Sequence, residues 1–195
     1  MSDARETLRD FMDRRIDRRT LLQAAASGLT GFAASAATIK TALAQDATPR
    51  GVIYGVVQNN DLLWYRHDGR NDGTFRWAFD AGKKVGNGWD VKHVFSGGDG
   101  IIYAVMQNSD LLWFRHDGRA DGTFRWAYDA GKKVGNGWDV KHVFYGGDSL
   151  IYAVTQNNDL LWYRHDGRND GTFRWAFDAG KKVGEGWDMK QVFAG

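Results

Sequence analysis

Cysteine is absent from the 195-residue chain, and this absence excludes three kinds of chemistry. Disulfide bridges, thiolate metal sites and cysteine nucleophiles all need the thiol group. The absence does not identify a compartment, because it fits reducing and oxidising surroundings alike. Proline is almost absent too. The single proline, Pro49, lies ahead of the internal repeats.

An excess of charge of one sign is also missing from most of the chain. The formal net charge is +2, and the first 44 residues account for all of it with seven basic and five acidic side chains. Binding to a phosphate backbone draws most of its affinity from clustered positive charge. The neutral remainder therefore argues against nucleic acid as the partner.

What the chain does contain is one unit repeated three times. Tyr54 returns as Tyr103 and Tyr152, a spacing of 49 residues, and three of the nine tryptophans fall in each copy. A period of about 50 residues indicates a solenoid, propeller or array, in which each unit buries apolar surface against its neighbours. We therefore divide the chain into repeats 51–99, 100–148 and 149–195, and expect any binding site to occur more than once.

The first 44 residues have the composition of an export signal. A charged stretch ends at Arg18 and Arg19, an uncharged run of mostly small residues spans 20–39, and Ala42 and Ala44 form an A-x-A pattern. This order of regions predicts a signal peptide, and the paired arginines resemble the twin-arginine type. Asp17 and Leu21 depart from the usual residues of that type.

Cleavage after Ala44 would leave residues 45–50 as a short leader and place the protein in the periplasm or outside the cell. A membrane anchor is the alternative, because about 18 uncharged residues can span a bilayer. The run contains Ala, Gly and Ser in place of the Leu, Ile and Val typical of an anchor, which favours the signal peptide.

Each repeat has the pattern of four short strands separated by turns, with no helical period. In the first copy we predict strands over Ile53–Val57, Leu62–His67, Thr74–Asp80 and Trp89–Phe95, and a glycine- and lysine-rich loop over Ala81–Gly88. Asp-Gly pairs between the second and third strands favour tight turns. The predicted fold is thus all-β.

Four antiparallel strands at this period are typical of a β-propeller blade. The chain supplies three blades, whereas propellers close with about four to eight. An incomplete ring would expose an apolar face at each end, and such faces mark association sites. We therefore expect two copies to form a homo-oligomer with six blades.

The order of motifs in the repeats resembles one known family. A glycine-rich loop, Gly-Trp-Asp, a strand ending in Val-Phe, then Ile-Tyr-Ala-Val and Asp-Leu-Leu-Trp follow one another in Gly86–Phe95 with Ile101–Trp113 and again in Gly135–Phe144 with Leu150–Trp162. This order is similar to the blade of the tachylectin family of β-propeller lectins. The resemblance implies binding of N-acetylated hexosamines at equivalent sites near blade junctions. Rings of that family typically have five blades in one chain, which three repeats do not match.

A sugar site needs flat aromatic faces and short polar side chains. The candidates follow the glycine-rich loops, where an aromatic residue precedes a carboxylate and follows an amide. They are Trp89, Asp90, Asn87, Trp138, Asp139, Asn136, Trp187 and Asp188, with Glu185 replacing the amide in the third copy. The alternative is that each Trp caps its blade and each Asp satisfies loop backbone donors.

The other tryptophans are assigned to packing. Trp77, Trp126 and Trp175 lie among apolar residues in the predicted third strand, and packing between blades is the favoured interpretation. Trp64, Trp113 and Trp162 lie in the second strand and are assigned to the core.

The sequence favours neither a metal nor a cofactor. His67, Asp68 and Asp72 suggest a calcium loop, but Arg70 stands where an oxygen ligand belongs, so a hairpin turn is the better interpretation. The histidines of the two series, His67 with its repeats and His93 with His142, are expected at solvated strand positions.

The leading hypothesis is therefore a multivalent lectin for N-acetylated amino sugars of cell-surface polysaccharides. A propeller that binds protein or acts as a structural scaffold is the alternative. No nucleophile with a base and no pair of acid and base carboxylates is evident, so we predict no enzymatic activity.

Overall fold

The computed structural model describes residues 51–194, and its secondary structure there consists of β-strands. The strands are β1 (Val52–Val56), β2 (Leu62–Arg66), β3 (Lys83–Gly86), β4 (Val91–Gly98), β5 (Ile101–Met106), β6 (Leu111–Arg115), β7 (Lys132–Gly135), β8 (Val140–Gly147), β9 (Leu150–Thr155), β10 (Leu160–Arg164) and β11 (Lys181–Gly184). The prediction of an all-β fold is confirmed. The predicted export signal and leader lie outside the described residues.

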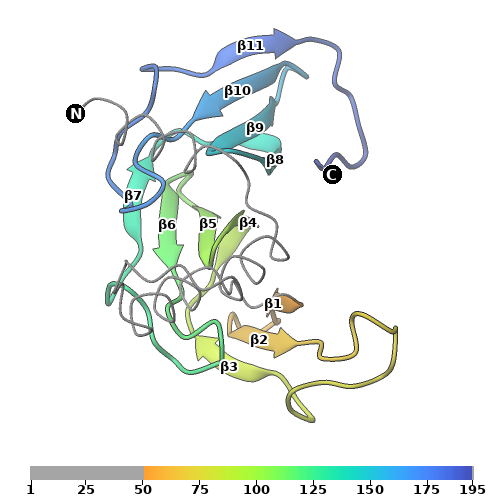
Figure 1. The fold of residues 1–195 in the computed structure, drawn as a ribbon. Coiled ribbons are helices and arrows are strands. Elements are labelled where there is room, and N and C mark those ends of the chain that lie inside the picture. Colours follow the sequence, from red (N-terminus) through yellow and green to blue (C-terminus); the bar gives the residue numbers. More distant parts are fainter. Residues whose placement is uncertain (1–50, 195) are drawn as a thin grey trace, which may run out of the picture. The chain divides into compact units, whose positions relative to one another are not determined.

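The strands form three antiparallel sheets that follow one another along the chain (Figure 1). Sheet 1 has the order β1-β2-β3, sheet 2 the order β4-β5-β6-β7, and sheet 3 the order β11-β10-β9-β8. Two sheets thus have the four strands expected of a propeller blade, and the first has three among the residues described. This arrangement is propeller-like.

The sheets are offset from the sequence repeats. β4 comes from the end of the first repeat but pairs with β5, placing Phe95 opposite Tyr103. β8 pairs with β9 in the same way, placing Phe144 opposite Tyr152. Each four-stranded sheet therefore takes its first strand from one repeat and the other three from the next. Within 51–194 the third copy of this strand, 189–194, is unpaired, and β1 has no neighbour on its outer edge.

The predicted strand over Thr74–Asp80 is wrong. In the structure this stretch is a loop joined to the preceding strand by one bridge, between His67 and Trp77. The Asp72 carboxylate accepts hydrogen bonds from the Thr74 amide and hydroxyl at 3.1 and 2.7 Å. Such local bonds compete with a strand ladder. The Lys-Lys-Val-Gly segments that were predicted as loops form strands instead, namely β3, β7 and β11, each at the edge of its sheet.

Apolar packing between consecutive sheets is centred on Trp64 of β2 and Trp113 of β6. Trp64 and Trp113 are almost completely buried, as predicted. A glycine of the following repeat lies against each ring. A Cβ on Gly122 would lie 2.5 Å from Trp64, and a Cβ on Gly171 would lie 2.4 Å from Trp113. Only residues without a side chain allow this close approach.

Hydrogen bonds repeat at the same junctions. The indole N–H groups of Trp64 and Trp113 donate to the backbone carbonyls of Arg119 and Arg168, at 3.0 and 2.8 Å. Each of these bonds joins a tryptophan of one sheet to the loop that follows β6 or β10 in the next sheet. The junctions are therefore fixed by directional contacts in addition to apolar packing.

The expectation of solvated histidines is wrong for His116 and His165, which are fully buried. Nε2–H of His116 donates to the Thr123 carbonyl at 2.8 Å, so Nδ1 accepts from the Tyr54 hydroxyl, also at 2.8 Å. His165 has the same bond with Tyr103 at 2.7 Å. The sequence pattern did not predict this burial, because residues of the neighbouring sheet, such as Tyr54, cover the histidines. Burial lowers the pKa of both imidazoles, since it disfavours the charged form.

None of the residues from 51 to 194 belongs to a helix long and apolar enough to cross a membrane.

The buried histidines predict an acid-sensitive fold. Because their pKa is lower in the folded chain, the unfolded chain binds protons more readily below the ordinary imidazole pKa of about 6.5. The free energy of unfolding should therefore be constant near pH 7.5 and fall as the pH drops from about 6.5 to 5. Urea denaturation at a series of pH values measures this.

His116→Gln should flatten part of that pH dependence. The control is His93→Gln, because the third repeat naturally carries Gln191 at the position equivalent to His93. If the free energy of unfolding of the wild-type protein stays constant down to pH 5, the assignment of neutral, buried imidazoles is wrong.

Candidate functional site

Two equivalent pockets lie where one sheet meets the next. The first, of about 110 Å³, combines the end of β3 in sheet 1 with the loop after β6 in sheet 2. Its lining is Gly86, Asn87, Trp89, Phe114, Phe124, Trp126, Tyr128, Asp129 and Ala130. The second, of about 240 Å³, has the equivalent residues from Gly135 to Gly180. These volumes are smaller than the range of about 300–1,000 Å³ typical for drug-sized ligands, so a single sugar ring is the appropriate scale.

Trp89 and Trp138 form the inner wall of the pockets. Trp89 follows β3 and Trp138 follows β7. The Trp89 amide donates to the Asn60 carbonyl at 2.8 Å, which fixes the loop. A Cβ on Gly86 would lie 2.4 Å from the Trp89 indole nitrogen, so the glycine-rich sequence is what allows the ring to lie against the strand. Both tryptophans are 6% exposed.

A second tryptophan closes each pocket from the next sheet. Trp126 lies 5.9 Å from Trp89 between ring centroids, and its indole N–H donates to the Val85 carbonyl at 2.7 Å. Trp175 repeats these contacts with Trp138 and Val134, at 5.8 and 2.7 Å. The predicted packing role between blades is thus observed for Trp126 and Trp175, and both also line the pockets.

The freely accessible aromatic faces belong to Phe124 and Phe173. Their side chains are 60% and 61% exposed. The neighbouring Tyr128 has the Lys132 ammonium 3.6 Å from its ring centroid, and Phe177 has Lys181 at 3.5 Å. Because those rings already carry a cation on one face, Phe124 and Phe173 are the better platforms for a ligand ring.

Polar side chains at the rim are exposed and short. Asn87 and Asp129 line the first pocket, and Asn136 and Asp178 line the second. An amide offers both a donor and an acceptor, while a carboxylate accepts. Each pocket therefore combines aromatic walls with groups that can orient hydroxyl or amide substituents.

The structure does not bring all predicted site residues together. Asp90 lines a separate hollow with Met106 and Gln107, and accepts a hydrogen bond from the Gln107 amide at 3.0 Å. Asp139 is 3.6 Å from Lys92, and Asp188 is 3.6 Å from Lys141. None of the three aspartates that follow a tryptophan lines either pocket.

The third copy of the site is only half formed by the described chain. Trp187 is partly exposed, in contrast to Trp89 and Trp138, and lines neither pocket. Its neighbour Glu185, at the position of Asn87 and Asn136, lies 3.3 Å from Lys182.

Sequence reasoning missed the outer half of the pockets. Phe124, Tyr128 and Asp129, with their counterparts Phe173, Phe177 and Asp178, belong to the stretch mistaken for a strand. An available signal was the acidic and glycine-rich turn ahead of each exposed phenylalanine, since that turn chemistry favours a loop.

The acidic turns serve as hydrogen-bond acceptors for their own loops. Bonds from Thr123 and Thr172 lower the pKa of Asp121 and Asp170. The hairpin-turn interpretation of these residues is consistent with that geometry. In the part of the chain that the structure describes, no group of three or more His, Asp or Glu side chains could hold a metal ion.

Comparison with known protein families gives a match that covers the three repeats. The model of the Tachylectin family matches residues 40–193. No curated protein matches the chain significantly.

The inner and outer walls of a pocket should respond differently to mutation. Trp138→Ala removes a buried ring and should lower the free energy of unfolding by about 3–5 kcal/mol. Phe173→Ser changes an exposed ring of the same pocket and should alter it by less than about 0.5 kcal/mol. Chemical denaturation of the two variants measures the difference. Equal stability of both variants would contradict the assignment of Trp138 to the core.

Proposed function

The chain belongs to the tachylectin family, and from that premise we propose that it is a multivalent lectin for N-acetylated amino sugars. Membership of the family indicates a lectin-like protein, and such proteins are generally non-catalytic. The finer assignment is supported by one observation above all: two equivalent pockets at the sheet junctions, each with an exposed phenylalanine beside an asparagine and an aspartate.

The chemistry of the pocket fits this class of ligand. The apolar face of a pyranose ring can lie on Phe124 or Phe173. The acetamido group presents one carbonyl and one N–H, which the amide of Asn87 or Asn136 can match in both directions. Several weak sites on one particle would raise the apparent affinity for a polysaccharide surface.

Assembly and export are part of the same proposal. We propose that two copies associate into a ring with six blades, because the three sheets of one chain leave apolar residues exposed at both ends. Phe75 at one end is 96% exposed and Phe193 at the other is 83% exposed. A ring of six lies within the usual range of about four to eight blades.

The export signal over residues 1–44, with Arg18 and Arg19 as the paired arginines, remains a proposal that rests on composition. We expect the protein recovered from the periplasm or medium to begin at Gln45. N-terminal sequencing tests this, and a retained Met1 on a membrane-bound protein would favour the anchor. Replacement of both arginines by lysine should block export if the route is of the twin-arginine type.

Sugar binding is best tested through the exposed phenylalanines. The double variant Phe124→Ser/Phe173→Ser should weaken binding of N-acetylglucosamine about tenfold or more at both complete pockets, because each loses its stacking face, while the free energy of unfolding stays within about 0.5 kcal/mol. Isothermal titration calorimetry measures the first and urea denaturation the second.

The control is Gln156→Ala, an exposed position outside both pockets, which should leave affinity unchanged. Failure of the wild-type protein to bind any acetamido sugar would overturn the proposal. It would favour the alternative, a propeller that binds protein or serves as a scaffold.

A further inference from the structure

We propose that a third pocket is assembled between two copies of this chain, and that residues 189–194 of one copy hold it together by pairing with β1 of the other. The inference gives the proposed ring of two copies a defined contact, and it rests on the proposed lectin function for the identity of the ligand. The assembly itself follows from contacts that repeat inside the chain and lack a partner at its two ends.

The outer half of a third pocket already exists on sheet 1. An open hollow there is lined by Tyr65, Phe75, Trp77 and Phe79. These residues are one repeat before Phe114, Phe124, Trp126 and Tyr128 of the first complete pocket.

The inner half that the hollow lacks is present at the other end of the chain. In the complete pockets it consists of the segments Gly86–Trp89 and Gly135–Trp138. Its third copy, Gly184–Trp187, follows β11 and faces no loop of the described residues. One copy of the chain therefore carries the two complementary halves of a pocket on opposite terminal sheets.

The polar contacts of the junctions show the same pattern. Trp162, the third copy of Trp64 and Trp113, has no acceptor for its indole N–H within residues 51–194, whereas the first two donate to the next loop. The equivalent loop carbonyl is that of Arg70. Gly73, which corresponds to Gly122 and Gly171, has open space where those two contact a tryptophan ring.

Burial differs in the same way. Val85 and Val134 are fully buried beneath the tryptophan of the next sheet and accept its indole hydrogen bond. Val183, their third copy, is 54% exposed. Trp77, the counterpart of Trp126 and Trp175, has no such acceptor among the described residues. Joining sheet 3 of one copy to sheet 1 of another would bury Val183 and give the Trp77 indole the Val183 carbonyl as its acceptor.

The unpaired segment 189–194 fits the open edge of β1 in a defined register. Shifting the β4–β5 ladder by the repeat length places Gln191 opposite Val56, Val192 opposite Gly55 and Phe193 opposite Tyr54. Phe95 and Phe144 stack on Tyr103 and Tyr152 in the equivalent pairs, with ring centroids 5.3 and 5.6 Å apart. Phe193 would gain the same stacking partner in the second copy.

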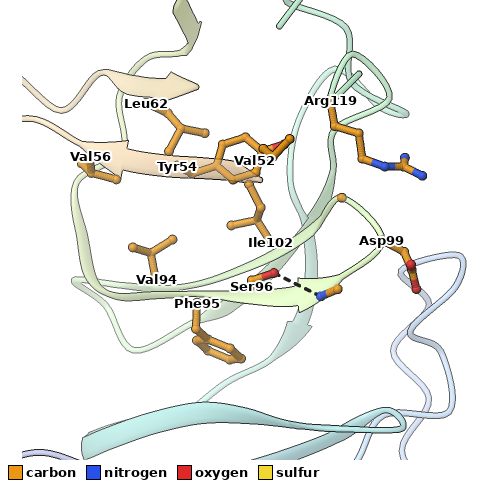
Figure 2. A pocket seen from close by; sticks show the side chains of 12 residues that line it. Val52, Tyr54, Val56, Leu62, Val94, Phe95, Ser96, Asp99, Ile102 and Arg119 are labelled. Carbon is orange, nitrogen blue, oxygen red and sulfur yellow. Dashed lines mark hydrogen bonds between the residues drawn. The ribbon is translucent and has the colours of Figure 1, made fainter. Parts of the chain in front are cut away.

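A cavity marks the place that this strand would occupy. It measures about 340 Å³, and Figure 2 shows Val52, Tyr54 and Leu62 of sheet 1 facing Val94 and Ile102 of sheet 2 around it. Empty apolar space of this size lowers stability. A phenylalanine entering from the edge of β1 would fill part of it.

An unpaired buried donor lies at the rim of that cavity. Arg119 Nε is buried and has no hydrogen-bond partner in the described chain. Its counterpart, Arg168 Nε, donates to the Gly97 carbonyl at 3.0 Å, at the end of the first strand of sheet 2. The exchanged segment 189–194 is the third copy of that strand, so its end would approach Arg119 in the assembly.

The contact joins different surfaces of the two copies, so it must be made twice to close a ring of two chains. Each ring then carries six sheets and six pockets. Two of these pockets lie between the two copies, and we call them the seam pockets. Each seam pocket takes Glu185 where the other four have asparagine. A carboxylate accepts but does not donate, so the seam pocket keeps its aromatic walls and lacks an amide donor for an acetamido carbonyl.

The seam pocket should therefore bind N-acetylglucosamine about five- to tenfold more weakly than the other two, which corresponds to the loss of one hydrogen bond. Glu185→Asn should remove the difference.

The strand register is tested by crosslinking the full-length chain, whose lack of cysteine gives a clean background. Val192→Cys with Gly55→Cys should form a covalent dimer on mild oxidation, because the two positions are opposite in the proposed ladder. A Cβ at Gly55 meets nothing within 4 Å. The matched control, Val192→Cys with Ile53→Cys, is displaced by two residues and should not crosslink, since such pairs are too far apart for a disulfide.

Light scattering should show a dimer for the wild-type protein. A folded monomer, or a dimer that crosslinks equally well in both pairs, would overturn the exchange. A monomer would mean that residues of the same chain, and not those of a second copy, cover the edge of β1. These outcomes are independent of sugar binding, so the assembly and the proposed binding of amino sugars can fail separately.

The number of sugar-binding sites per chain tests the existence of the seam pocket. Calorimetry should find three sites per chain in the wild type, the third weaker. Phe75→Ser alters only the seam pocket and should reduce the number to two while crosslinking persists. Two sites in the wild type together with an intact dimer would overturn the seam pocket.

Discussion

The structure depends on the fact that none of its sheets can bury its own faces. Trp64 of β2 and Trp113 of β6 each pack against a glycine of the following repeat, as Gly122 does against Trp64. The indole N–H also finds its acceptor there. Apolar burial and hydrogen bonding are therefore satisfied at the same place, and both require a neighbouring sheet.

The pockets are a consequence of the same constraint. Trp126 reaches back to donate to the carbonyl of Val85, and the loop that carries it must then pass in front of Trp89. Both tryptophans line the pocket, and Phe124 lines it as an exposed side chain. Packing thus fixes the inner wall, while the outer wall is free to contact a ligand. This division explains why a buried tryptophan is a poor probe of binding and an exposed phenylalanine is a good one.

Local patterns predicted much of the fold. The first two strands of each repeat were predicted within one or two residues, because β-branched runs and Asn-rich turns determine them over a few positions. The third strand was missed, since its Lys-Lys-Val-Gly sequence resembles a loop and becomes a strand only by pairing with β2. For the site, Asn87 and Trp89 were identified with their repeats, and Asp90 was placed beside them although it faces Gln107.

The sequence by itself determined that the repeats are all-β, that their unit recurs every 49 residues, and that any junction formed once must form again. These properties depend on neighbouring residues and on identity between copies. Only the tertiary structure decided that each four-stranded sheet crosses a repeat boundary, that His116 is buried, and that Phe124 is exposed. Those outcomes depend on which distant segment covers a given face, and residues far apart in the chain leave no local pattern from which such contacts can be predicted.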